Sequence, residues 1–115
     1  MISLVRAAHA RDMYVMVDVV ANHVGYIDTS KEGFSAIKPF DKEEYYHPDC
    51  EIKDWNDDQQ MHNCRLAGLP DLDESNDQVR SLLKIWIKWL VYTYEFDGVR
   101  IDTLGHMPND FWKEF

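Results

Sequence analysis

Two charged side chains near the C-terminal end of the sequence have the types and spacing for covalent chemistry. In the segment Gly98 to His106, Arg100 and Asp102 alternate with Val99 and Ile101, so an extended backbone places both charges on one face. A nearby guanidinium favours the ionised carboxylate, and an ionised Asp102 is able to attack an electrophilic carbon. By itself, however, an Arg-x-Asp pattern more often marks a structural ion pair at a strand end.

A second candidate segment lies upstream, where the apolar run Tyr14 to Val20 is broken only by Asp18. The run predicts a parallel strand covered on both faces, although a buried helical segment has the same pattern. On a strand, Asp18, Val20 and Asn22 point to the same side. The polar groups of Asp18 and Asn22 then converge at the carboxyl end of the strand, where parallel α/β folds have their sites.

Composition sets wide bounds on what the chain binds. Its 115 residues are 45% hydrophobic, which indicates a globular protein, and the formal net charge of −9 argues against nucleic acid as a partner. A soluble protein with neutral or cationic partners, neutral sugars among them, fits this charge. No apolar run reaches the ~20 residues of a membrane span, and the N-terminus lacks the layout of a signal peptide.

The remaining elements follow from periodicity and end signals. A helical stripe over residues 2–13 starts without a capping residue, which indicates that Met1 is an internal methionine. Ser75 to Gln78 is a capping-box signature for a helix that ends near Tyr94, and the Asp97–Gly98 turn follows it. A last helix is expected over residues 109–115, capped by Asn109 or Asp110.

Between the predicted strand and the long helix, residues 25–70 lose this regularity. So long a connection is commonly functional or a small subdomain, and we interpret it as a subdomain. It contains the chain's two cysteines, Cys50 and Cys64. They form either a disulfide that stabilises by roughly 3 kcal/mol, or a reduced pair as in a cytosolic protein, and spacing does not decide between these.

The alternation of helix and strand predicts βα units in an α/β fold. A closed (β/α)₈ barrel and an open doubly wound sheet both fit this order. Two strands alone would leave long unpaired edges, so the chain is expected to be a piece of a larger domain.

Three segments together resemble successive signature regions of the α-amylase family, glycoside hydrolase family 13. Their order and spacing over about 90 residues are far more specific than any one of them. The similarity is greatest to fungal-type α-amylases, and it includes the cysteine pair and the segment from Tyr45 to Cys50. The three segments are Asp18-Val19-Val20-Ala21-Asn22-His23, Leu69-Pro70-Asp71-Leu72-Asp73 and Gly98-Val99-Arg100-Ile101-Asp102-Thr103 with His106.

The resemblance implies a partial (β/α)₈ TIM barrel that contributes the third and fourth strands with flanking helices. Residues 1–24 would be a barrel part, residues 25–70 an inserted small domain B, and residues 71–115 a second barrel part. The parent protein would be secreted, with Cys50 and Cys64 as a disulfide.

The resemblance also implies a retaining glycosidase that cleaves internal α-1,4-glucosidic bonds of starch and maltooligosaccharides. Asp102 would be the nucleophile, and Arg100 would keep it charged and oriented. A second carboxyl group, about 5 to 5.5 Å away, would protonate the leaving oxygen. His23 and His106 would contact the sugar.

Calcium is the cofactor that the resemblance implies. Asn22 and Asp71 would bind it through side-chain oxygens and His106 through its backbone carbonyl, all hard oxygen donors of the kind that Ca²⁺ prefers. The ion would join residues 25–70, which we call the excursion, to the barrel.

Two departures from the family pattern concern the substrate and the metal. Position 105, commonly a lysine that touches sugar on the leaving-group side, is Gly105, and His62 stands where a glutamate often offers its backbone carbonyl to calcium. The general acid and a third carboxylate would lie beyond Phe115, so these 115 residues alone are expected to be inactive. An α-glucosidase, a transglycosylase and a non-catalytic relative are the alternatives.

Overall fold

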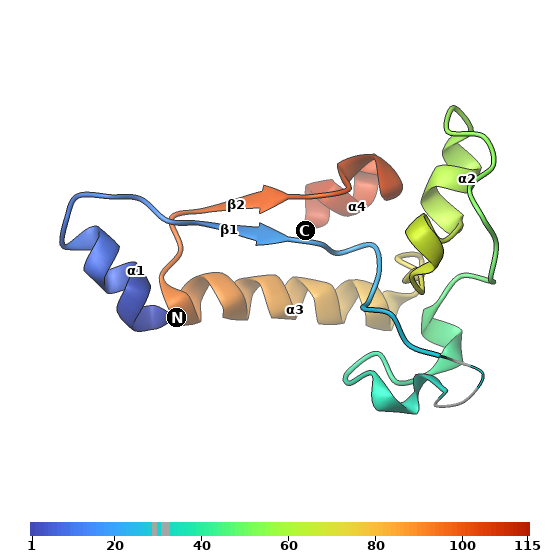
Figure 1. Cartoon of the computed structure of the whole chain (residues 1–115), viewed down its shortest axis with the longest axis horizontal. Helices are drawn as coiled ribbons and strands as arrows, with labels where there is room; N and C mark the ends of the chain where they lie inside the picture. The colour runs from blue at the N-terminus through green and yellow to red at the C-terminus, as the bar shows by residue number, and fades with distance from the viewer. Residues whose placement is uncertain (29, 31–32) are drawn as a thin grey trace.

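A computed structural model of the chain describes residues 1–28, 30 and 33–115. Two parallel strands lie side by side along the long helix α3, and the irregular excursion gathers beyond their carboxyl ends (Figure 1). The elements in chain order are α1 (Ile2–His9), β1 (Met16–Val19), the 3₁₀ turns η1 (Phe34–Ala36) and η2 (Glu43–Tyr45), α2 (Asp58–Asn63), η3 (Leu66–Gly68), α3 (Asp77–Tyr94), β2 (Gly98–Ile101), η4 (Leu104–His106) and α4 (Asn109–Glu114).

The two strands pair in parallel and confirm the predicted α/β arrangement. Their register places Asp18 opposite Arg100 and Val19 opposite Ile101. Beyond the ladder, the Asp102 amide donates to the carbonyl oxygen of Val19 at 2.9 Å, so the pairing extends to the residue of chemical interest. The sequence therefore located both strands correctly.

Strand β1 is shorter and less covered than the sequence predicted. It spans Met16–Val19 rather than residues 14–20, and Tyr14 is 91% exposed. Within these 115 residues α3 lies against one side of the strand pair, so Val19 is buried while Met16 and Asp18 are exposed (Figure 1). The 115 residues therefore supply cover for one face of the strand only, and the predicted cover of the other face stays a prediction about the larger domain.

Helix α3 begins one residue later than the capping-box signature predicted. The Asn76 side chain is the cap, and its Oδ1 accepts from the amides of Gln78 and Val79 at 2.9 and 3.4 Å. The hydroxyl of Ser75 instead donates to Asp73 Oδ1 at 2.5 Å, so it is not available as a cap. Helix α3 ends at Tyr94, as predicted, where Glu95 adopts a left-handed conformation with φ 62°.

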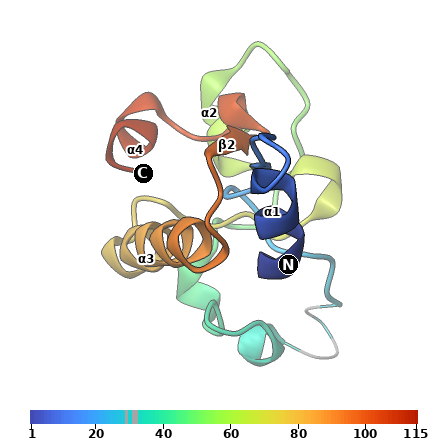
Figure 2. The same cartoon turned by 90° about the vertical axis from the view of Figure 1, so that its left-hand side faces the viewer.

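The two short helices at the chain ends lie on opposite sides of the strands (Figure 2). Helix α1 ends at His9 rather than Met13, because the chain turns at Asp12, which has a left-handed φ of 57°. Helix α4 follows Pro108 and has no side-chain cap, since both predicted capping residues, Asn109 and Asp110, lie inside it.

The core lies between α3, α4 and the excursion. Val79 and Leu83 of α3 pack with Phe111 of α4, and Tyr46 and Leu72 extend this cluster into the excursion. On the rim, Arg80 forms ion pairs with two carboxylates of α4, at 2.9 and 3.0 Å. The long helix α3 therefore packs against both α4 and the excursion.

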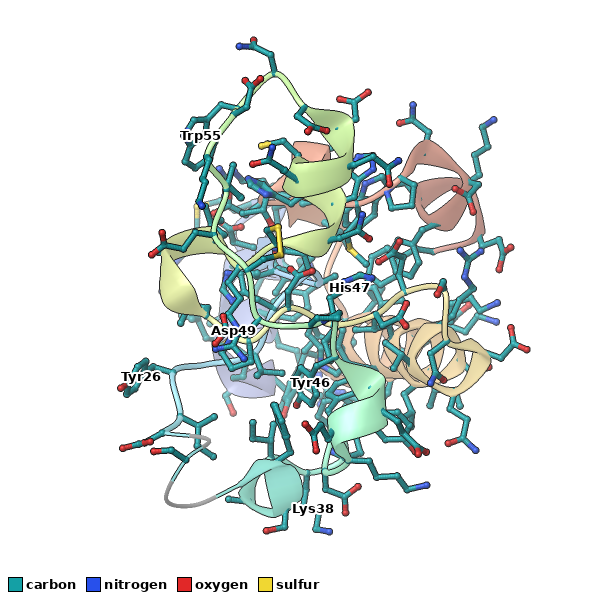
Figure 3. All side chains as sticks on the ribbon, turned by 90° about the vertical axis from the view of Figure 1, so that its right-hand side faces the viewer. Tyr26, Lys38, Tyr46, His47, Asp49 and Trp55 are labelled. Carbon is teal, nitrogen blue, oxygen red and sulfur yellow. A yellow bond between two sulfur atoms is a disulfide. The ribbon has the colours of Figure 1, made fainter. Side chains whose placement is uncertain are left out.

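In the part of the excursion that the structure describes, isolated bridges rather than a separate sheet hold the chain. His23 pairs with Asp71 and Tyr46 with Leu72, both antiparallel, while Glu51 pairs with Arg65. In Figure 3 Tyr46 and His47 lie toward the middle of the molecule. Among the described residues, no helix is long and apolar enough to cross a membrane.

Candidate active site

The carboxyl ends of β1 and β2 bring three charged side chains together. Arg100 Nη1 donates to both carboxylate oxygens of Asp18, at 2.7 and 2.6 Å, across the strand pair. Arg100 Nη2 lies 3.5 Å from Asp102 Oδ1, so the guanidinium reaches the next residue on its own face as well. The predicted Arg100 and Asp102 contact is present, but the shorter contact of Arg100 is with Asp18. That contact raises the pKa of Arg100 above its ordinary value.

The Asp102 carboxylate is positioned by the turn that follows β2. Its Oδ1 accepts the backbone amide of Thr103 at 2.9 Å, and 49% of its side chain is exposed. Thr103 has a left-handed φ of 55°, an uncommon conformation for a β-branched residue, and its hydroxyl donates to Asn22 Oδ1 at 2.7 Å. The strained turn thus leaves Asp102 accessible and links it to the end of the other strand.

Asn22 and Asp71 form a buried polar pair beside this turn. Each residue is 1% exposed, and Asn22 Nδ2 donates to Asp71 Oδ1 at 3.4 Å. The Leu72 amide donates to the Asn22 carbonyl oxygen at 2.7 Å, which brings the second motif against the first. Burial raises the pKa of Asp71 above its ordinary value and outweighs the opposing effects of His47 and Asn22.

His47 belongs to this cluster, although no sequence pattern assigned it a role of its own. Its Nδ1 lies 2.9 Å from Asp71 Oδ2. Burial lowers the pKa of His47, but the hydrogen bond and charges of nearby carboxylates, Asp71 first, exceed that effect and raise it overall. The sequence signal for His47 was its place in the segment from Tyr45 to Cys50, which resembles fungal-type α-amylases. In the structure, the bridge between Tyr46 and Leu72 brings this segment next to Asp71.

The two predicted sugar-contacting histidines differ in their surroundings. His106 is 8% exposed, its Nδ1 donates to the Met61 carbonyl oxygen at 3.2 Å, and its ring meets the Trp55 ring edge-on at 6.2 Å between centroids. His23 is half-buried and donates from Nδ1 to the Val24 carbonyl oxygen at 3.0 Å. The first ring is thus held by the excursion, while the second remains near the surface.

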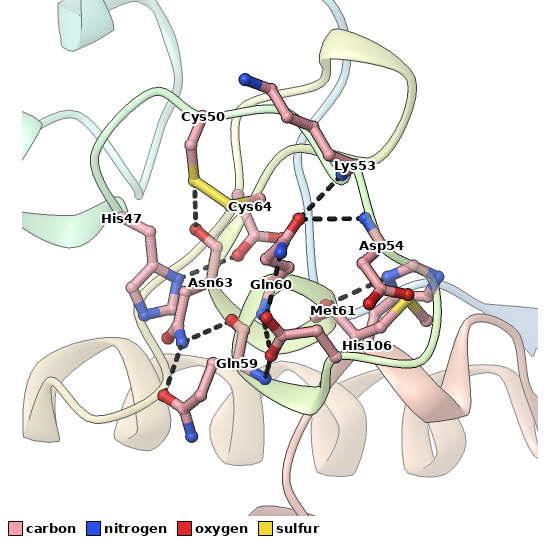
Figure 4. The surroundings of a disulfide bond; sticks show 12 residues. His47, Cys50, Lys53, Asp54, Gln59, Gln60, Met61, Asn63, Cys64 and His106 are labelled. Carbon is pink, nitrogen blue, oxygen red and sulfur yellow. Dashed lines mark hydrogen bonds and ion pairs between the residues drawn. A yellow bond between two sulfur atoms is a disulfide. The ribbon is translucent and has the colours of Figure 1, made fainter.

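The disulfide is formed, which settles the two alternatives for the cysteines. Cys50 and Cys64 are bonded, with their Cα atoms 4.8 Å apart, and the bond closes the loop that contains α2. Figure 4 shows this bond in the same region as the contact between His106 and Met61. The disulfide therefore stabilises the loop that holds His106.

Gly105, the main departure from the family pattern, lies in open space. A Cβ atom built at this position would meet no atom within 4 Å. Packing within the chain therefore does not exclude a longer side chain at position 105. Glycine in place of lysine removes a side chain that could contact a ligand at this surface.

Fold and site together define part of a parallel α/β domain with carboxylates at the carboxyl ends of its strands. The family model of the alpha-amylase catalytic domain matches residues 1–114, and the chain belongs to that family.

Named relatives agree with this assignment. The chain is 43% identical over 116 residues to the beta/alpha-amylase of Paenibacillus polymyxa, a match that covers 97% of this chain and 10% of that protein. The alpha-amylase structure from Malbranchea cinnamomea is 38% identical with a TM-score of 0.92, and the match covers 99% of this chain and 25% of that one. The alpha-amylase of Geobacillus thermoleovorans in complex with acarbose is 42% identical with a TM-score of 0.86, and the match covers 98% of this chain and 24% of that one.

Proposed function

We propose that the full-length protein is a retaining glycosidase that hydrolyses internal α-1,4-glucosidic bonds of starch and maltooligosaccharides. The chain spans between a tenth and a quarter of the three proteins just named, so this activity belongs to a larger molecule. The proposal rests on the accessible Asp102 carboxylate beside Arg100 at the carboxyl end of β2, in a member of the alpha-amylase family. The acarbose complex of the Geobacillus relative supports an α-glucan as the substrate.

In this proposal Asp102 attacks the anomeric carbon and forms a covalent glycosyl-enzyme. Its Oδ1 already accepts the amide of Thr103, which orients the carboxylate. Arg100, fixed by Asp18, keeps positive charge beside the nucleophile. A general acid from beyond Phe115 protonates the leaving oxygen and then activates water. His23 contacts the sugar at the site of cleavage.

The proposed architecture is a partial (β/α)₈ barrel with β1 and β2 as its third and fourth strands. Residues 1–24 and 71–115 belong to the barrel, and residues 25–70 form domain B. The parallel register of the strands and the long α3 beside them support this assignment, because a barrel repeats that unit. The exposed sides of Met16 and Asp18 then face parts of the barrel that lie outside these residues.

We propose calcium as the cofactor, bound by Asn22 and Asp71 through side-chain oxygens and by the backbone carbonyl of His106. The donors fit, because they are oxygen atoms and Asp71 is a buried carboxylate whose burial a cation would offset. When bound, the ion joins the end of β1 to the excursion. Asn22 and Asp71 already lie in contact through Asn22 Nδ2, while Asn22 Oδ1 accepts from Thr103, so the Asn22 amide would turn over to present its oxygen to the ion.

Secretion of the full-length protein is part of the proposal. The Cys50–Cys64 disulfide supports it, since disulfides form and persist in oxidising compartments.

Product analysis on the full-length protein tests the activity. Incubation with starch is expected to release a range of maltooligosaccharides, with the α-anomer formed first, as detected by chromatography and NMR. Release of glucose alone would indicate an α-glucosidase, and new glucosidic linkages would indicate a transglycosylase. No reaction with any α-glucan would contradict the proposal.

A further inference from the structure

A second polar cluster lies next to the proposed calcium ligands and is not explained by them. His47, Asp73 and Glu74 each offer one ligand atom, and these atoms all lie within 4.8 Å of one another. His47 Nε2 is 3.4 Å from Asp73 Oδ1. In tetrahedral zinc sites with bonds of about 2.0 Å, neighbouring ligand atoms are roughly 3.3 Å apart, so this pair already has a suitable spacing.

Glu74 supplies an independent indication of a missing ligand. The residue is only 6% exposed, and its Oε2 is buried without a hydrogen-bond partner among the described residues. A buried carboxylate oxygen without a partner is costly, and such atoms commonly face an ion or an ordered water. The contact that Arg80 makes here goes to the Glu74 backbone carbonyl oxygen and does not reach Oε2.

The histidine is oriented as metal-binding histidines commonly are. Asp71 Oδ2 lies 2.9 Å from His47 Nδ1, which leaves Nε2 directed toward Asp73 Oδ1 at 3.4 Å. A carboxylate on one ring nitrogen fixes the tautomer and raises the basicity of the other nitrogen. The other oxygen of Asp71, Oδ1, accepts from Asn22, so Asn22 and His47 contact different oxygen atoms of Asp71.

We propose that His47 Nε2, Asp73 and Glu74 bind a divalent transition-metal ion, with Zn²⁺ as its representative, at a site separate from the calcium site. One imidazole nitrogen and two carboxylates suit Zn²⁺, whereas Ca²⁺ and Mg²⁺ prefer oxygen ligands alone. The ion supplies positive charge where two carboxylates flank one histidine. The ion would hold the segment before α3 against the segment after η2. This proposed site does not depend on the proposed glycosidase activity.

Calorimetry on the metal-depleted full-length protein tests this site. Calcium is first added to saturation so that its own site is filled, and zinc chloride is then titrated at neutral pH. We expect one Zn²⁺ per protein under these conditions. Binding of Zn²⁺ that disappears when calcium is present would assign it to the calcium site and overturn the proposal, as would no binding at all.

Glu74→Gln is the decisive variant, because it keeps the side-chain size and leaves the backbone contact of Arg80 in place. It should weaken zinc binding by at least about tenfold, while unchanged affinity would refute the site.

His47→Gln should abolish the nitrogen contribution to the visible spectrum of bound Co²⁺. The matched controls are Glu44→Gln and His9→Gln, whose side chains lie in other ion pairs. Both should bind zinc as the wild type does.

Discussion

Arg100 binds Asp18 more closely than it binds Asp102. Its Nη1 atom contacts both oxygens of Asp18, at 2.7 and 2.6 Å, while its Nη2 atom lies 3.5 Å from the proposed nucleophile. These three side chains come from directly paired positions of two strands and from the residue after them. Asp18 therefore fixes the guanidinium, and the guanidinium in turn reaches Asp102.

Arg100→Lys should lower kcat/KM of the full-length protein on starch by about tenfold to hundredfold, the scale of a small misplacement of catalytic groups. A lysine ammonium is a single point charge and cannot serve Asp18 and Asp102 with the planar geometry of arginine. Steady-state kinetics measure the effect, with Arg6→Lys, in an exposed ion pair with Glu95, as the control. Equal kinetics for Arg100→Lys and wild type would remove the positioning role.

Asp102→Asn should reduce turnover of starch by roughly 10⁴-fold or more, because an amide cannot form the glycosyl-enzyme. The variant should fold normally, since the side chain is half exposed and retains an oxygen that can accept the Thr103 amide. Kinetics together with circular dichroism check both statements. Asp110→Asn, an exposed aspartate of α4, is the control and should remain active. Activity close to that of the wild type in Asp102→Asn would exclude this residue as the nucleophile.

Removal of calcium should destabilise the full-length wild type and have little effect on Asp71→Asn. An ion present at about 100 times its Kd stabilises the folded state by about 2.7 kcal/mol, and a chelator removes that contribution. Denaturant unfolding with and without calcium measures the difference. Asp12→Asn is a suitable control, because asparagine tolerates the left-handed conformation found there. A calcium response in Asp71→Asn equal to that of the wild type would contradict the assignment.

The Tyr46 phenol should lose its proton at a higher pH than an exposed tyrosine, and its ionisation should lower the stability of the protein at alkaline pH. Burial, with a smaller contribution from the charge of Asp41, raises the pKa of the Tyr46 phenol from 10.0 to about 12. Because the folded-state pKa is the higher one, the stabilisation from the neutral phenol is complete below about pH 10. It is then lost as the pH rises toward about 12.

The phenolate absorbance of wild type minus that of Tyr46→Phe isolates this titration. The difference should have its midpoint near pH 12, and Tyr46→Phe should lose less stability than wild type between pH 10 and 12. Tyr26→Phe is the control, because Tyr26 is 80% exposed. A Tyr46 difference titration centred near pH 10 would show that the phenol is not buried as described.

Local periodicity predicted those features that depend on one segment at a time. The alternation in β2 placed Arg100 and Asp102 on one face, and the two residues are in contact. The end of α3 at Tyr94 was predicted for the same reason. Its start was missed by one residue, because Ser75 and Asn76 are both good caps and the choice depends on which side chain Asp73 engages.

Contacts between distant segments were beyond such patterns. The pairing of Asp18 with Arg100 depends on the register of two strands that are 82 residues apart in sequence. His47 meets Asp71 beside the bridge between Tyr46 and Leu72, where the His47 amide donates to the Asp71 carbonyl oxygen at 3.0 Å. These relationships arise from tertiary structure, and no spacing in the sequence encodes them.

The in-register pairing of β1 and β2 also restricts how the length of this chain can change. Side chains alternate along a strand, so deletion of one residue before Asp18 would turn the remaining side chains of β1 to the opposite face. Asp18 would no longer lie beside Arg100, and the Arg100 guanidinium would lose the contact that fixes it near Asp102. The excursion has no such alternation to preserve, and its bridges are isolated. Natural insertions and deletions should therefore accumulate between Gly25 and Pro70 and be absent from the two four-residue strands.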